Sequence, residues 1–194
     1  MKTRTKALLL VMSAMLLVVS TVFATMAYLT STAEVKNTFT VGNITIEMDE
    51  AKVNEYGEVE AGAERVTANT YKLIPGHTYV KDPTVTVKAN SEKCYVFVRI
   101  VNEIATIESG TTIEAQITAK GWTLLDGTTD VFYQVVDYAT ADKELVVFEE
   151  FTIATDADVS TYLGKTVHVK AYAIQYDGFN SNPTGAWTAV YSAS

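Results

Sequence analysis

The sequence has a single cysteine, Cys94, so it cannot form an internal disulfide and a packed core has to stabilise the fold. Cys94 opens the run CYVFVRI, in which most residues are apolar and favour strands. Free cysteines are among the most buried residues of proteins. We therefore expect Cys94 to be a small buried hydrophobic residue rather than a reactive thiol.

Histidine and the usual catalytic motifs are equally scarce. The chain has only two histidines, His77 and His168, and no HExxH motif. A zinc hydrolase needs about three protein ligands and an open position. His77 follows a Pro-Gly turn and His168 lies in a predicted strand, so ordinary turn and surface roles explain both. The sequence also lacks a GxSxG elbow and a glycine-rich phosphate loop. It therefore predicts no catalytic residue, no metal site and no cofactor.

Two short carboxylate pairs, Asp126 with Asp130 and Asp156 with Asp158, have the spacing of calcium ligands in loops. Neither pair belongs to a complete helix-loop-helix calcium motif with its terminal glutamate. Solvated turns explain them more simply. No pattern marks one acid as buried and another as exposed, as a glycosidase would require.

Positive charge is in short supply: the chain has 15 basic and 23 acidic residues, a net charge of −8. Three basic residues precede the first apolar run, so residues 28–194 hold 12 basic and 23 acidic side chains, a net charge of −11. Nucleic acids and anionic membranes both require a basic surface. We expect neither as a partner, and the balance fits a soluble exported protein.

Charge is absent altogether from residues 7–33. A basic start, an apolar middle and the exit Thr25-Met26-Ala27, with small side chains at both specificity positions, are typical of a secretory signal peptide. The apolar run is also long enough to span a bilayer of about 30 Å, which leaves retention as a membrane anchor as the alternative. We predict that residues 1–27 are a signal peptide, cleaved between Ala27 and Tyr28.

Removing the first 27 of 194 residues leaves 167, enough for one domain with a proper core. Residues 94–101 form the clearest strand, and because both of its alternating faces are mostly apolar we predict a central position. Other segments alternate or favour strands in the same way, namely 44–48, 83–89, 131–138, 145–153, 165–176 and 187–191. Residues 103–120 are compatible with a strand or a short helix, and 159–163 with one helical turn.

Seven to nine short strands separated by turn signals, without an amphipathic helix of useful length, predict an all-β fold. We expect a single β-sandwich over residues 28–194. A jelly roll and an immunoglobulin-like Greek key both satisfy the pattern.

Four segments of the chain carry a resemblance: the exit MAYLTS, the strand NTFTVGNITIEM, the turn and strand LIPGHTYVKDPTVTVKAN, and VKAYAIQYDGF near the end. Together they resemble the TasA/camelysin family, secreted proteins of Gram-positive bacteria with a SipW-type signal peptide. The resemblance implies a jelly roll, processing by a dedicated signal peptidase, and assembly into fibres of the biofilm matrix. It also brings the metalloendopeptidase label of camelysin, for which this sequence lacks the ligands.

After cleavage the chain would begin with a strand-prone segment, residues 28–40, whose first part contains no glycine, proline or helical pattern. A free end of this kind can pair with an open sheet edge of the next subunit and so build filaments. It can also pack as an edge strand on its own domain. The predicted donor strand consists of Tyr28, Leu29, Thr30, Ser31, Thr32, Ala33, Glu34, Val35, Lys36 and Asn37.

From these observations we expect a secreted structural protein of the extracellular matrix or cell surface. Its partners would be the signal peptidase during export, and then further copies or related matrix subunits. Membrane contact would come only through the uncleaved signal. The alternatives are a membrane-anchored cell-surface binding module and a camelysin-like metalloendopeptidase.

The signal prediction has a direct test. Mass spectrometry of the protein recovered from the culture medium should find Tyr28 as its first residue, because the small side chains before it fit the peptidase. Full-length protein confined to the membrane would instead favour the anchored module.

Overall fold

The computed structural model describes residues 5–6, 8–18 and 43–193. Residues 5–6 and 8–18 are helical and belong to a unit separate from the domain formed by residues 43–193. In this described part of the chain, no helix is both long and apolar enough to cross a membrane. The predicted cleavage site, Ala27 and Tyr28, and the strand-prone segment 28–40 lie outside the described residues.

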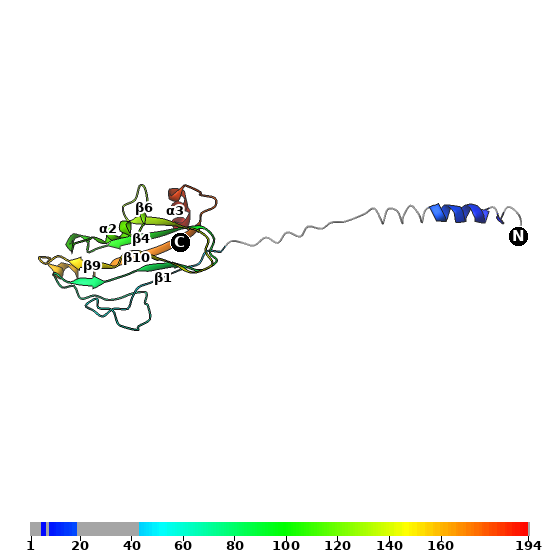
Figure 1. The fold of residues 1–194 in the computed structure, drawn as a ribbon. Helices are drawn as coiled ribbons and strands as arrows, with labels where there is room; N and C mark the ends of the chain where they lie inside the picture. Colours follow the sequence, from blue (N-terminus) through cyan, green and yellow to red (C-terminus); the bar gives the residue numbers. More distant parts are fainter. Residues whose placement is uncertain (1–4, 7, 19–42, 194) are drawn as a thin grey trace. The chain divides into compact units, whose positions relative to one another are not determined.

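The domain is mostly β-structure, in three antiparallel sheets, which confirms the all-β prediction (Figure 1). The first sheet has the order β1-β3-β8 and contains β1 (Ile46–Asp49), β3 (Thr84–Val87) and β8 (Lys143–Val146). The second has the order β10-β4-β7-β6, with β10 (Val167–Gln175), β4 (Cys94–Asn102), β7 (Val131–Val136) and β6 (Thr123–Leu124). The third has the order β2-β9-β5, with β2 (Thr78–Val80), β9 (Glu150–Ile153) and β5 (Glu108–Ser109).

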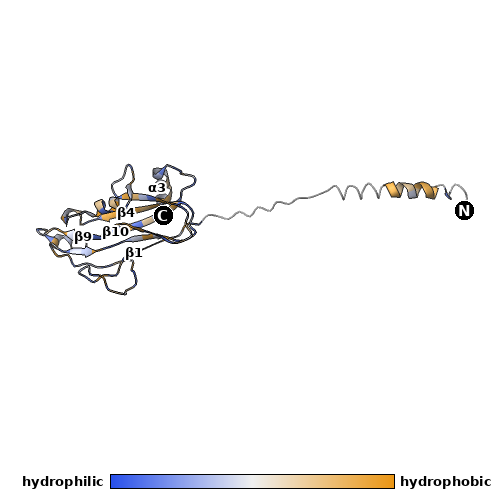
Figure 2. Cartoon of the chain, viewed as in Figure 1, coloured by the Kyte–Doolittle hydropathy of each residue, from blue (hydrophilic) through white to orange (hydrophobic). Residues whose placement is uncertain are grey.

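Strand β4 is central, as its apolar pattern predicts. It pairs with β10 on one side and β7 on the other, and Figure 2 shows hydrophobic colouring along much of it. Its alternating faces enter two separate cores. Cys94, Val96 and Val98 belong to the main core, whereas Tyr95 and Phe97 belong to a second, smaller one. A strand with two apolar faces has to be covered on both sides, and the domain supplies both covers.

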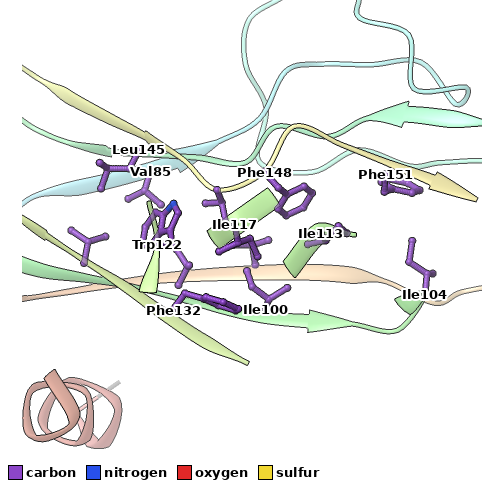
Figure 3. Close-up of a cluster of buried hydrophobic side chains, with 14 of the residues drawn as sticks. Val85, Ile100, Ile104, Ile113, Ile117, Trp122, Phe132, Leu145, Phe148 and Phe151 are labelled. Atoms are coloured by element: carbon purple, nitrogen blue, oxygen red, sulfur yellow. The ribbon is translucent and has the colours of Figure 1, made fainter. Parts of the chain in front are cut away.

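Part of the main core fills the space between the first and second sheets (Figure 3), and the third sheet adds Tyr79, Phe151 and Ile153 to it. Val85 and Leu145 approach it from the first sheet, and Ile100 and Phe132 from the second. The indole of Trp122 lies among them, and its Nε1 donates a hydrogen bond to the Val146 carbonyl at 2.9 Å. A buried tryptophan thus keeps its polar atom satisfied.

Cys94 is fully buried in this core, as the sequence predicts. Burial disfavours the thiolate and raises the pKa of Cys94 to about 11. At neutral pH the side chain is therefore an uncharged thiol that packs as a small hydrophobic group.

The domain holds two α-helices: the first is the short helix that the sequence allows within residues 103–120, and the second corrects a predicted strand. Helix α2 (Ile113–Ala119) begins at Thr112, whose hydroxyl accepts a hydrogen bond from the Ala115 amide, and it buries Ile113 and Ile117. Helix α3 (Pro183–Ser192) replaces the strand predicted at residues 187–191. The Asn182 side chain caps it by accepting from the Gly185 amide, and Pro183 occupies a first-turn position.

The predicted strand at residues 145–153 is wrong as one element, because it is divided between β8 and β9 in different sheets. The Gln116 side chain of α2 reaches this break. Its Oε1 accepts from the amides of Glu149 and Glu150 at 3.1 and 3.3 Å, and its Nε2 donates to the Glu150 carbonyl at 2.8 Å. The backbone groups released by the break are thereby satisfied. The short 3-10 helices are η1 (Ala105–Ile107) and η2 (Val159–Tyr162), the latter at the predicted helical turn.

Candidate functional site

A groove of about 1310 Å³ opens on the domain beside strand β10. The end of β1 and residues 67–73 form one wall, and residues 162–172, which include most of β10, form the other. Met48, Ile104, Phe151 and Val169 lie at its apolar base. The groove is therefore an opening that reaches the main core.

Both strands beside the groove are sheet edges. Among the strands of residues 43–193, β10 pairs only with β4, and β1 pairs only with β3. Past the end of β1, backbone hydrogen bonds join Glu50 and Val66 in an isolated β-bridge. Within residues 43–193, no strand pairs with the outer edge of β10. An uncovered edge presents a row of backbone donors and acceptors that can receive another strand.

The main core is incompletely sealed at these edges. Several of its apolar side chains pack against buried residues and yet remain partly exposed, namely Ile46, Met48, Tyr71, Leu73, Val167, Ala171 and Ala173. They come from β1, from residues 67–73 on the same wall, and from β10 on the other wall. Free backbone edges above an apolar base are the two features by which a groove binds an extended peptide as an added strand.

A buried ion pair closes one end of the groove. The Lys81 ammonium lies 2.6 Å from a carboxylate oxygen of Glu50, and their side chains are only 11% and 5% exposed. The Asn69 amide donates to the same carboxylate at 2.9 Å, and the Lys81 ammonium lies 5.9 Å from the centre of the Tyr71 ring. Burial, together with the charge of Glu50, raises the pKa of Tyr71, so its hydroxyl stays protonated and donates to the Val80 carbonyl.

A second ionic cluster holds the chain excursion formed by residues 50–71, which we call the acidic excursion. Arg65 contacts Asp49 at 2.5 Å and Asp82 at 2.9 Å, and it donates to the Thr84 hydroxyl at 3.1 Å. Burial alone would lower the pKa of Arg65, but its hydrogen bonds to the two carboxylates raise it. Arg65 thus ties the excursion to β1 and to the residues just before β3.

The two histidines lie at different places in the fold. His77 precedes β2, and its Nε2 lies 2.8 Å from the Tyr56 carbonyl. His168 is exposed on β10, opposite Val101 of β4. In residues 5–6, 8–18 and 43–193, no group of three or more His, Cys, Asp or Glu side chains is placed to hold a metal ion.

The carboxylate pairs occupy turns. Asp130 accepts a hydrogen bond from the Arg99 guanidinium at 2.8 Å, whereas Asp126 is exposed in the turn before it. Asp158 accepts from the Ser160 hydroxyl and amide at the start of η2, and these hydrogen bonds lower its pKa. The sequence did not reveal the groove or the Glu50–Lys81 pair, because the residues that form them lie far apart in the chain.

The chain matches no protein-family model, no curated protein and no solved structure. Its function is therefore inferred from the groove, its free edges and the sequence.

The Glu50–Lys81 pair predicts a large effect of a single substitution. Lys81→Met should lower the free energy of unfolding by about 3–5 kcal/mol, because it leaves the Glu50 carboxylate buried without its counter-charge. Lys52→Met is the matched control: the Lys52–Glu60 pair is 47% and 42% exposed, so its loss should cost at most about 1 kcal/mol. Urea unfolding measures both, and equal losses would contradict a buried pair.

Proposed function

We propose that this chain is a secreted structural protein of the extracellular or biofilm matrix, whose copies assemble into fibres by strand donation. Residues 1–27 direct export and are removed. Residues 28–37 of one copy then occupy the groove of the next. The observation that carries the proposal is the combination of an apolar base with the free edges of β1 and β10.

The length of the donor segment suits this role. β10 has nine residues, and the donor segment has ten. At about 3.3 Å per residue, each spans roughly 30 Å as an extended strand. The donor can therefore follow β10 along the part that lines the groove, Val167–Tyr172, and pair with the backbone groups that the domain leaves free there.

The alternation of side chains in the donor also suits the groove. In an extended strand, Leu29, Ala33 and Val35 share one face with the small polar Ser31 and with Asn37. The other face carries Tyr28, Thr30, Thr32, Glu34 and Lys36, and so holds both charged residues. The apolar face would pack on the partly exposed Val167 and Ala171 and complete the seal of the main core.

Donation to a neighbour leads to an open chain of subunits. Each copy offers its N-terminal segment through one surface and receives a segment through another, so the contact is head-to-tail and need not close. Cleavage then controls assembly, because an uncut segment stays tethered to the signal. Packing of residues 28–37 into the groove of their own copy is the competing arrangement.

We further propose that the three sheets form one β-sandwich of jelly-roll type, with an immunoglobulin-like Greek key as the alternative. The position of the main core between the first and second sheets supports a sandwich. The resemblance of the sequence to the TasA/camelysin family favours the jelly roll and the matrix role. In this proposal the chain is not an enzyme.

Absence of peptidase activity is testable. The purified protein should not cleave casein in a chelator-sensitive manner, because His77 and His168 lie in separate parts of the fold. The double variant His77→Ala/His168→Ala should behave like the parent chain in the same assay. Chelator-sensitive cleavage that the double variant loses would revive the metalloendopeptidase hypothesis.

Strand donation predicts that two defective variants complement each other only in part. Deleting residues 29–37, which preserves the Ala27–Tyr28 bond, should leave a folded acceptor that forms no filaments. Ala171→Asp should leave a chain that can still donate its own segment but cannot accept one, because the incoming strand would bury the new carboxylate. Mixed together, the two variants should form dimers and no filaments, as measured by electron microscopy and light scattering.

Gln175→Asp is the matched control, since Gln175 is exposed at the far end of β10 and does not line the groove. This variant should assemble normally. Filaments formed by the deletion variant alone would show that residues 29–37 are not the donor. A deletion variant of lowered stability, with no dimer in the mixture, would indicate that the segment packs on its own domain.

A further inference from the structure

An amine, a carboxylate and a carboxamide meet at one end of the groove, around the side chain of Glu50. One carboxylate oxygen of Glu50 lies 2.6 Å from the Lys81 ammonium, and the other accepts a hydrogen bond from Nδ2 of Asn69 at 2.9 Å. A single carboxylate therefore holds a lysine amine and an asparagine amide next to each other. We call these three side chains the Lys–Glu–Asn cluster.

The carboxamide of Asn69 has a fixed orientation. Besides its bond to Glu50, Nδ2 donates to the Ala51 carbonyl at 2.8 Å, and Oδ1 accepts from the Val53 amide at 3.1 Å. A nucleophile that attacks Cγ places negative charge on Oδ1. That oxygen already faces a backbone N–H donor, which is the arrangement that stabilises an oxyanion.

The cluster is shielded from water. The Glu50 and Lys81 side chains are 5% and 11% exposed. The Tyr71 ring lies 5.9 Å from the Lys81 ammonium and packs edge-on against Tyr79 and Phe151. Proton transfer between two groups 2.6 Å apart converts this buried ion pair into a neutral acid and a neutral amine, and neutral lysine amines are nucleophiles.

We propose that the Lys–Glu–Asn cluster forms an isopeptide bond between Nζ of Lys81 and Cγ of Asn69, with Glu50 as the proton carrier. Nζ attacks Cγ, and the bond between Cγ and Nδ2 breaks. Nζ releases two protons: Glu50 delivers one to the departing Nδ2 and keeps the other. The products are one amide bond, one ammonia and a neutral Glu50, so atoms and charges balance without an oxidant or a cofactor. All three residues line the groove, which gives ammonia a path to solvent.

The bond fastens the acidic excursion to the residue that follows β2, and so holds the groove wall of residues 67–73 covalently. A chain with one cysteine has no internal disulfide for this purpose, and an amide bond does not depend on the redox state of the surroundings. The reaction also replaces a buried ion pair by neutral groups, which removes the cost of desolvating two charges. It is independent of strand donation and goes beyond the proposed function.

Mass spectrometry of the protein recovered from the culture medium tests the bond. The intact mass should be lower than that of the sequence by about 17 Da, the mass of one ammonia. Trypsin should release residues 66–72 linked to residues 73–88, because a modified Lys81 is no longer a cleavage site. A folded protein of full mass would overturn the proposal. The same mass loss without the linked peptides would indicate a succinimide at an asparagine and would also overturn it.

Substitutions assign the bond to the cluster. Lys81→Arg keeps a positive charge beside Glu50 but has no amine to attack, so it should have the full mass of its own sequence and the circular dichroism of the parent chain. Glu50→Gln, which cannot carry the proton, should also have its full mass. Asn54→Ala is the matched control: Asn54 donates to Glu58 at 2.8 Å, but within residues 43–193 Glu58 has no lysine partner, so the mass loss should persist. A mass loss that persists in Lys81→Arg would overturn the assignment.

Discussion

Burial of β4 on both faces is the constraint on which the rest of the domain depends. Its two sets of alternating side chains require a cover on each side of the second sheet. The first sheet and α2 cover the side of Val96 and Val98, and α3 covers the side of Tyr95 and Phe97. β7 and β10 flank β4, and β10 is the last strand on its side of the described sheet, so it is an edge strand. Its free edge lines the groove.

An edge above an incompletely sealed core is ordinarily a liability, since it invites unintended pairing. Here the surroundings keep the opening in shape. The Glu50–Lys81 pair and the contacts of Arg65 hold the groove wall with charged hydrogen bonds rather than with apolar packing. A groove that keeps its shape while empty loses less entropy when a strand enters it, which favours binding of a donated segment.

Local alternation in the sequence by itself determined the all-β class, the central strand at residues 94–101 and the burial of Cys94. A period of two needs no knowledge of the partner strand. The same information was insufficient at residues 187–191, where a short apolar run suits either a strand or a helix. There the Asn182 cap and the packing of Trp187 on Phe97 favour the helix. The sequence supplied the proposed donor segment, but only the tertiary structure made β10 an edge and so created the groove, because strand order depends on contacts between residues far apart in the chain.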